Sequence, residues 1–393
     1  MVLLDRLRGS ESRPVTISGL DELVAQARSR ARLDDLGAVG WQDGLVHLLD
    51  AARSDLPPDA DSEARLEQNI LSRLDIRLRT EDWYADREAE APPISGLVVI
   101  HGLPRTATTA LQFLLAIGPT FRFQRRWEIS SPVPPAGSIS DDDDPRRLAA
   151  LAKDSGGGGS VQHIASVDGP ADDGQLLGLG FHNQELGLPL PSYTRWWRSA
   201  DLTTTYAYHE RILRMLHTRR PPHRWLVKAP YHNFHLDDLA RQYPEAMFVM
   251  AHRDPTLALP STCSTVATAQ RNALPNSPPD PKKLGRFLLE HLVDGIGRAM
   301  RARQSIGEHR FIDISQKEVE TDAVGVAERI YRFLGLELDG STRAAMAEWS
   351  DANPPGARGK HAYSPEEYGL TGKEIREAFR DYIDRFDIQS ETG

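Results

Sequence analysis

The stretch ISGLVVIHGLPRTATTALQFLLA, residues 94–116, joins a β-branched apolar run, a glycine-containing turn and an apolar segment with helical spacing. An apolar run of this length is typical of a buried strand in a parallel sheet. A strand, a glycine-containing turn and a helix together aim backbone N–H groups and the positive end of the helix at one anion. The stretch therefore predicts an anion-binding loop between a strand and a helix.

This loop differs from the pattern that nucleotide triphosphatases use for ATP, G-x-x-x-x-G-K-[ST]. Between Gly102 and Thr109 the first glycine and the last threonine are kept, but Ala107 replaces the second glycine and Thr108 replaces the lysine. Arg105 supplies a positive charge instead, and a guanidinium can bind nonbridging oxygens in a bidentate manner. We predict a phosphate-binding loop whose task differs from that of the ATP loop in triphosphatases. A plain turn whose threonines cap the helix is the alternative.

Two more apolar runs, RWLVKAP (224–230) and AMFVMAHRDP (246–255), flank a helical pattern in NFHLDDLARQY (233–243). Because strand, helix and strand recur, we predict an α/β fold with a P-loop-like parallel sheet flanked by helices. Residues 1–93 carry apolar residues at helical spacing and are expected to form a helical N-terminal region. The α/β domain is expected to cover residues 94–393.

Composition narrows the class of protein. The chain has 393 residues and a net charge of −9, which argues against nonspecific nucleic-acid binding because that needs a basic face. No apolar run approaches the roughly 20 residues of a membrane span, and the first ten residues lack the pattern of an export signal. A single cysteine, Cys263, excludes an intrachain disulfide and a multi-cysteine metal site. We expect a cytoplasmic protein, and homo-oligomers are compatible with the sequence.

The motifs resemble those of sulfotransferases that use 3′-phosphoadenosine 5′-phosphosulfate (PAPS). GLPRTATT (102–109) is similar to the 5′-phosphosulfate loop of this family. The resemblance covers most of residues 94–388 and is strongest toward bacterial members; its further blocks are RWLVKAPYHNFHLDDL (224–239), YPEAMFVMAHRDPTLALPS (243–261) and GKHAYSPEEYGL (359–370). It implies transfer of a sulfuryl group from PAPS to a hydroxyl of a small-molecule or lipid-like acceptor, with adenosine 3′,5′-bisphosphate as product.

The resemblance places the 5′ end of PAPS in the loop. Arg105 would stabilise charge on the departing bridging oxygen. Ala107 stands where the family has Gly or Ser. The candidate residues of the loop are Gly102, Leu103, Pro104, Arg105, Thr106, Ala107, Thr108 and Thr109.

For the 3′-phosphate, the family uses an arginine at a strand end and a serine eight positions later on the next helix. Arg253 and Ser261 match this spacing, and the two side chains supply a charged fork and a hydroxyl donor. A structural ion pair between Arg253 and Asp254 is the alternative. The family also closes a basic loop over this phosphate. Arg358, Gly359 and Lys360 resemble that loop with the order of Lys and Gly exchanged, and a solvated basic turn is the alternative.

Lys228, at the end of RWLVKAP, matches a lysine that the family positions at the sulfate. The carboxyl edge of a parallel sheet is where ligands collect, which favours this role over a lysine that merely reaches solvent.

The general base is assigned from the resemblance to one branch of the family. Animal cytosolic members have a histidine two residues after the strand lysine, where this chain has Pro230. Tyrosylprotein sulfotransferases use a glutamate just beyond the loop helix, and RRWEISSP (125–132) sets Glu128 there. We predict Glu128 as the base, because a carboxylate can accept the acceptor's proton. His232 and His235 are the alternatives, and either can instead cap or line the following helix.

The sequence is also compatible with two other functions. The first is an ATP- and magnesium-dependent phosphotransferase, which the missing loop lysine disfavours. The second is a noncatalytic nucleotide-binding protein of the same fold. We predict no metal site, because the H-x-x-H spacing of His232 and His235 has no cysteine or acidic partner at ligand spacing. Acceptor selection is expected in the helical N-terminal region and in residues 130–205.

Overall fold

The computed structural model describes residues 15–38, 40–135, 140–154, 166–183, 185–218, 224–354 and 363–390. All strand pairs in its central sheet are parallel, and the strand order is β2-β3-β1-β4-β5. The strands are β1 Val98–Gly102, β2 Phe121–Arg122, β3 Arg224–Lys228, β4 Met247–His252 and β5 Phe311–Ser315. The sheet is flanked by helices, so the α/β fold class predicted from the sequence is confirmed.

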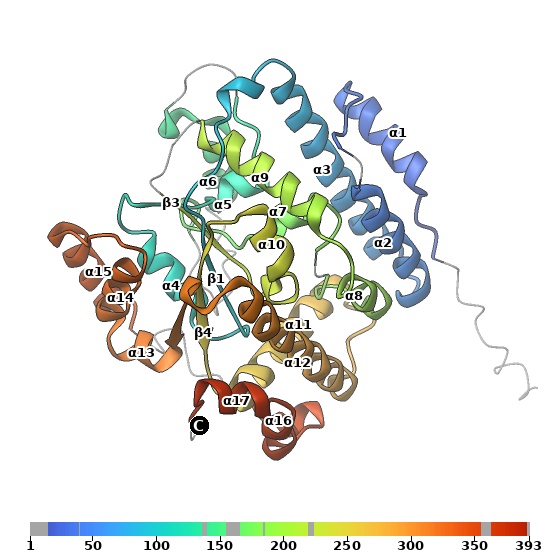
Figure 1. Cartoon of the computed structure of the whole chain (residues 1–393). Helices are drawn as coiled ribbons and strands as arrows, with labels where there is room; N and C mark the ends of the chain where they lie inside the picture. The colour runs from blue at the N-terminus through green and yellow to red at the C-terminus, as the bar shows by residue number, and fades with distance from the viewer. Residues whose placement is uncertain are drawn as a thin grey trace, which may run out of the picture.

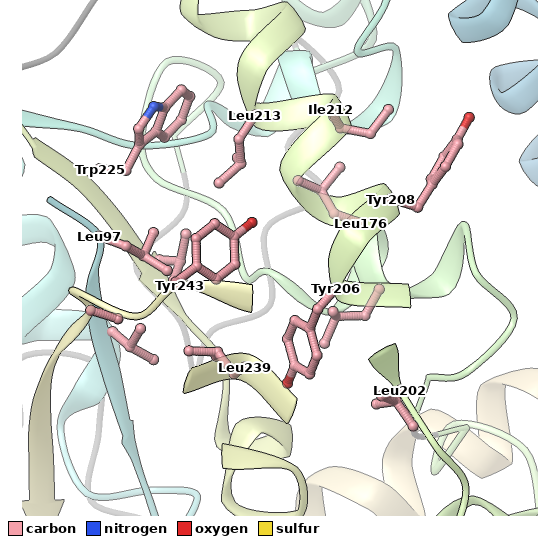
Figure 2. Close-up of a cluster of buried hydrophobic side chains, with 14 of the residues drawn as sticks. Leu97, Leu176, Leu202, Tyr206, Tyr208, Ile212, Leu213, Trp225, Leu239 and Tyr243 are labelled. Atoms are coloured by element: carbon pink, nitrogen blue, oxygen red, sulfur yellow. The ribbon is translucent and has the colours of Figure 1, made fainter. Parts of the chain in front are cut away.

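Successive strand residues point to opposite sides of the sheet. Because the central strands β1 and β4 are largely apolar, both faces of the sheet are apolar, and helices cover both of them. Val99 and Phe248 face a hydrophobic cluster that includes α9 (Thr203–His217), whereas Val98 and Val249 face one that includes α4 (Thr108–Leu115). Figure 2 shows part of the first cluster, with Leu213 of α9 near Trp225 of β3 and Tyr206 of the same helix near Leu239. Burial of each such large apolar side chain contributes about 1.5–3 kcal/mol.

The remaining helices follow the chain around the sheet (Figure 1). Two groups of helices lie on opposite sides of the sheet: α13 Gln316–Thr321, α14 Ala323–Phe333 and α15 Gly340–Ala352 on one side, and α1 Leu20–Ala31, α2 Trp41–Asp55 and α3 Ala60–Ala85 on the other. The bounds of the other helices are α5 Arg126–Ser130, α6 Pro145–Asp154, α7 Gly174–Gly178, α8 Pro191–Trp197, α10 Leu236–Gln242, α11 Pro255–Ala273, α12 Pro281–Ile306, α16 Gly372–Ala378 and α17 Arg380–Phe386.

The N-terminal residues form three helices, α1 Leu20–Ala31, α2 Trp41–Asp55 and α3 Ala60–Ala85. They share a hydrophobic cluster with later segments, including Tyr193 and Trp197 of α8. The helical character of this region agrees with the sequence pattern, while a domain boundary at residue 93 stays a prediction. Within the described ranges, no helix is both long and apolar enough to cross a membrane.

Helix α11 begins where the sequence places strong start signals. The side chain of Asp254 accepts a hydrogen bond from the backbone N–H of Thr256, and Pro255 occupies the first helical position. The turn between β4 and α11 is therefore short. It holds Arg253 at the end of the strand and presents Ser261 on the following helix, on the same edge of the sheet as the loop after β1.

Candidate active site

The loop after β1 starts at a glycine that no other residue can replace without movement. Gly102 has φ +135°, and a Cβ added there would lie 2.3 Å from the carbonyl oxygen of Ala251. Gly102 and Ala251 are also register partners of the parallel pair β1 and β4. The glycine thus allows the chain to turn while the two central strands stay in register.

The loop then adopts two left-handed residues before the helix. Arg105 has φ +68° and Ala107 has φ +63°. Ala107 is the N-cap of α4 and offers no side-chain acceptor, so a threonine does not cap this helix from the N-cap position. The hydroxyl of Thr106 instead donates to the carbonyl of Leu103 within the loop. The N–H groups in the first turn of α4 therefore depend on acceptors other than the N-cap side chain.

The structure brings together Arg105, Arg253 and Ser261, which are far apart in the sequence. Arg105 Nε donates to Ser261 Oγ at 3.1 Å, and Arg253 Nη1 donates to the carbonyl oxygen of Arg105 at 3.0 Å. Arg253 Nε is buried and has no hydrogen-bond partner among the described residues. Asp254 pairs with a different arginine, Arg376. This arrangement leaves a buried cationic donor at the strand end.

Burial lowers the pKa of Arg105, and the positive charge of Arg253 lowers it further. The two guanidinium groups therefore repel each other across a poorly solvated space. An anion bound between them would relieve this repulsion.

A cavity of about 930 Å³ opens beside the loop and α11; we call it the central cavity. Its loop side carries Pro104, Arg105, Ala107, Thr108 and Thr109. The other charged and polar side chains that line it are Gln112, Arg126, Ser166, Asp172, Gln175, Asn183, Lys228, Tyr231, Asn233, Arg253, Thr262, Thr265 and Gln316. Leu186, Phe234, Val266 and Leu292 form an apolar part of its wall.

Lys228 reaches this cavity from the end of β3 and pairs with a carboxylate that the sequence analysis missed. Lys228 Nζ donates to Asp172 Oδ2 at 2.7 Å, and Asp172 Oδ1 accepts the N–H of Gly174 at 3.0 Å. The lysine side chain is 9% exposed and that of Asp172 is 39% exposed. No motif spacing marks Asp172 in the sequence, because it lies on an irregular segment before α7.

Glu128 lies beneath the surface and outside the lining of the central cavity. It forms a bidentate pair with Arg122, in which Nη1 and Nη2 donate to the two carboxylate oxygens at 2.9 and 2.5 Å. The backbone N–H of Arg125 also donates to Oε2, which completes a capping box at α5. Its neighbours Arg126 and Ile129 do line the cavity. The structure thus gives Glu128 a capping and pairing role, and its role as base stays a prediction.

The two histidine alternatives are also buried. His232 Nδ1 lies 2.9 Å from the hydroxyl of Tyr206, and its Nε2 lies 3.1 Å from Asp173 Oδ2. His209 contacts the other oxygen of Asp173 at 3.0 Å. Burial alone would raise the pKa of Asp173, but the two histidines outweigh it and hold this pKa well below its usual range. His235 packs edge-on against Trp197. None of these side chains is part of the described cavity lining.

Other predicted residues lie outside the cavity lining or outside the described residues. Leu103 is buried in a hydrophobic cluster with α11 and α12, rather than in the cavity lining. Arg358, Gly359 and Lys360 lie outside the described residues. A residue that the sequence analysis missed is Asn233, which donates to the carbonyl of Gly102 at 2.7 Å and contacts His101 Nδ1 at 2.8 Å. In the part of the chain that the structure describes, no cluster of side chains is suited to a metal ion.

A five-stranded parallel sheet with this loop at its carboxyl edge, and with arginines and a lysine converging there, defines an α/β protein with a candidate site for an anionic ligand. The chain belongs to the sulfotransferase family, whose family model matches residues 98–340.

Two solved structures have the same overall fold. The sulfotransferase STF9 from Mycobacterium avium is 29% identical, with a TM-score of 0.86 over 96% of this chain and 99% of that one. The sulfotransferase STF1 from Mycobacterium tuberculosis H37Rv is 25% identical, with a TM-score of 0.79 over 93% of this chain and 99% of that one. Comparison with curated proteins finds no match.

Proposed function

We propose that this protein transfers a sulfuryl group from PAPS to a hydroxyl of a small-molecule or lipid-like acceptor and releases adenosine 3′,5′-bisphosphate. Family membership supports the class of reaction. The observation that carries the donor assignment is the cluster of Arg105, Arg253 and Ser261, in which Arg253 Nε is buried without a partner among the described residues. A donor with a phosphate at one end and a phosphosulfate at the other needs several cations, and this cluster lines the same cavity as Lys228.

In this proposal each group has a defined task. The backbone N–H groups of the loop, with Thr108 and Thr109, hold the 5′ end of the donor. Arg253 and Ser261 hold its 3′-phosphate. Arg105 and Lys228 neutralise charge that develops on the oxygen between phosphorus and sulfur as the sulfuryl group leaves. The chain's own carboxylate receives the proton of the acceptor hydroxyl.

The first test is sulfuryl transfer from PAPS, detected by mass spectrometry, to a panel of phenols, sterols, sugars and lipid alcohols. We expect a sulfated product with at least one class. The apolar wall formed by Leu186, Phe234, Val266 and Leu292 favours a phenol, sterol or lipid alcohol over a sugar. Absence of product across the panel, with adenosine 3′,5′-bisphosphate still bound, would favour a noncatalytic binding protein.

The second test separates this function from an ATP-dependent phosphotransferase. Calorimetry compares adenosine 3′,5′-bisphosphate with ATP plus magnesium, and we expect binding of the bisphosphate alone. Arg105→Ala should weaken that binding, whereas Arg271→Ala, on an exposed part of α11, should leave it unchanged. Tight binding of ATP with no response to the bisphosphate would refute the proposal. A cytoplasmic location belongs to the same proposal.

A further inference from the structure

Asp172 is the one carboxylate among the described residues that line the central cavity. The other charged side chains in that lining are Arg105, Arg126, Lys228 and Arg253, and all of them are cations. Cations suit an anionic donor. A single, partly exposed carboxylate among these cations repels that donor. Its presence therefore indicates a task other than binding the donor.

The backbone around Asp172 holds this carboxylate in place from both sides. The N–H of Ala171 donates to the carbonyl of Gln124 at 2.9 Å, and Gln112 of α4 donates to the carbonyl of Ala171 at 3.1 Å. On the other side, the N–H of Asp173 donates to the carbonyl of Lys228 at 2.9 Å. The segment is thus tied both to the helix that follows the loop and to the end of β3. Such ties position a side chain more accurately than a free loop does.

The other candidate bases are already engaged. Glu128 has both oxygens bound by Arg122, and removing it from that buried pair would leave an uncompensated charge. His232 is fully buried, with its two ring nitrogens directed at Tyr206 and Asp173. Both oxygens of Asp172 also accept hydrogen bonds, from Lys228 and from the N–H of Gly174, but this carboxylate is partly exposed and lines the cavity together with its lysine partner.

We propose that Asp172 is the general base that receives the proton of the acceptor hydroxyl; this inference rests on the proposed sulfuryl transfer. The acceptor oxygen forms a bond to sulfur while the bond between sulfur and the bridging phosphate oxygen breaks. The electron pair of the broken bond stays on the 5′-phosphate of adenosine 3′,5′-bisphosphate. The proton moves to a carboxylate oxygen of Asp172 and then to solvent, so the carboxylate is regenerated.

Lys228 couples this base to the donor. In the structure it pairs with Asp172 at 2.7 Å, and its ammonium group has two further protons to donate. The same ammonium therefore serves the anionic sulfuryl group and the carboxylate beside it. This pairing holds the carboxylate and the ammonium group next to each other in the cavity lining.

The test compares Asp172→Asn with Asp168→Asn, a carboxylate on the same segment that pairs with Arg147 outside the cavity lining. On the acceptor found in the panel, Asp172→Asn should lower kcat by about 10²–10⁴-fold, the usual contribution of a general base. Affinity for adenosine 3′,5′-bisphosphate should be retained. Asp172→Glu should restore part of the activity with an altered pH profile, and Asp168→Asn should behave as wild type.

A second measurement needs no acceptor. Calorimetry gives the affinity of each variant for PAPS and for adenosine 3′,5′-bisphosphate. If Asp172 faces the sulfuryl group, Asp172→Asn should raise the ratio of PAPS to bisphosphate affinity by about fivefold, the order expected for removal of one nearby unit charge. A purely structural carboxylate would change both affinities together.

The outcomes separate this inference from the function on which it rests. An unchanged affinity ratio, or a kcat of Asp172→Asn within threefold of wild type, would overturn the role of Asp172 while wild-type transfer upholds the function. A selective loss of kcat in Glu128→Gln, with its unfolding midpoint unchanged, would reassign the base to Glu128. No transfer and no bisphosphate binding by wild type would overturn both proposals.

Discussion

Replacing Gly102 by alanine tests the geometry of the loop after β1. The substitution adds a methyl group 2.3 Å from the carbonyl oxygen of Ala251, in a residue whose φ is +135°. A left-handed backbone costs an L-residue roughly 1–2 kcal/mol, and overpacking against a fixed neighbour costs about 1–3 kcal/mol. The neighbour here is the backbone of β4, which cannot retreat without disturbing its register with β1. We expect a loss of about 2–5 kcal/mol in the free energy of unfolding.

Two other glycines separate the contributions to this loss. Gly335 has φ +67° and no atom within 4 Å of an added Cβ, so Gly335→Ala should lose about 1 kcal/mol from backbone conformation alone. Gly340, the first residue of α15, has open space and no positive φ, so Gly340→Ala should lose nothing. The expected order of stability is Gly340→Ala, then Gly335→Ala, then Gly102→Ala.

Urea unfolding followed by tryptophan fluorescence measures these differences, since the chain contains seven tryptophans. Calorimetry on the folded protein then measures affinity for adenosine 3′,5′-bisphosphate, which should fall only in Gly102→Ala because that loop is displaced. An unfolding midpoint for Gly102→Ala equal to that of Gly335→Ala would refute the clash with β4. Unchanged bisphosphate affinity would show that the loop does not hold the ligand.

Three further predictions address charged groups. Arg253→Met should weaken adenosine 3′,5′-bisphosphate binding about ten- to hundredfold in calorimetry, because hydrogen bonds to a charged group are lost; unaltered affinity would place the 3′-phosphate elsewhere. Arg122→Met should lower the free energy of unfolding in urea by about 3–5 kcal/mol, because Glu128 would stay buried without its partner; a loss below about 1 kcal/mol would contradict this. Burial lowers the pKa of His291 to about 3, so below about pH 6.5 the unfolded chain binds more protons than the folded one. The free energy of unfolding therefore decreases as the pH is lowered. Between pH 6 and pH 5, wild type should lose about 1 kcal/mol more than His291→Gln; equal losses in urea unfolding at the two pH values would show that this histidine titrates normally.

The central part of the fold could be predicted because its signals are strong. The runs that became β1, β3 and β4 are continuous and apolar, as expected for strands buried on both faces. β2 has only two residues, and β5 is an edge strand with partly exposed positions, so neither gives a clear pattern. Within residues 130–205, where acceptor selection is expected, the aromatic residues Tyr193 and Trp197 pack in a hydrophobic cluster with the N-terminal helices.

The candidate site could be predicted only where a motif fixes local geometry. Arg253 and Ser261 meet Arg105 because a strand end, a short turn and a helix have fixed offsets. The environment of Glu128 could not be foreseen, because nothing in the sequence shows that Arg122 occupies both of its oxygens. Asp172 reaches the cavity through tertiary hydrogen bonds of an irregular segment, and such contacts leave no periodic signal.

The contact between Arg105 and Arg253 has a practical consequence for handling the protein. Burial and the positive charge of Arg253 both lower the pKa of Arg105, so an anion bound beside these side chains should stabilise the folded protein, and we expect inorganic sulfate or phosphate in a buffer to do so. Such ions should also compete with adenosine 3′,5′-bisphosphate at the proposed site. Affinities measured after purification in these buffers will therefore be underestimated, and exhaustive exchange into chloride should restore the full value while lowering the melting temperature.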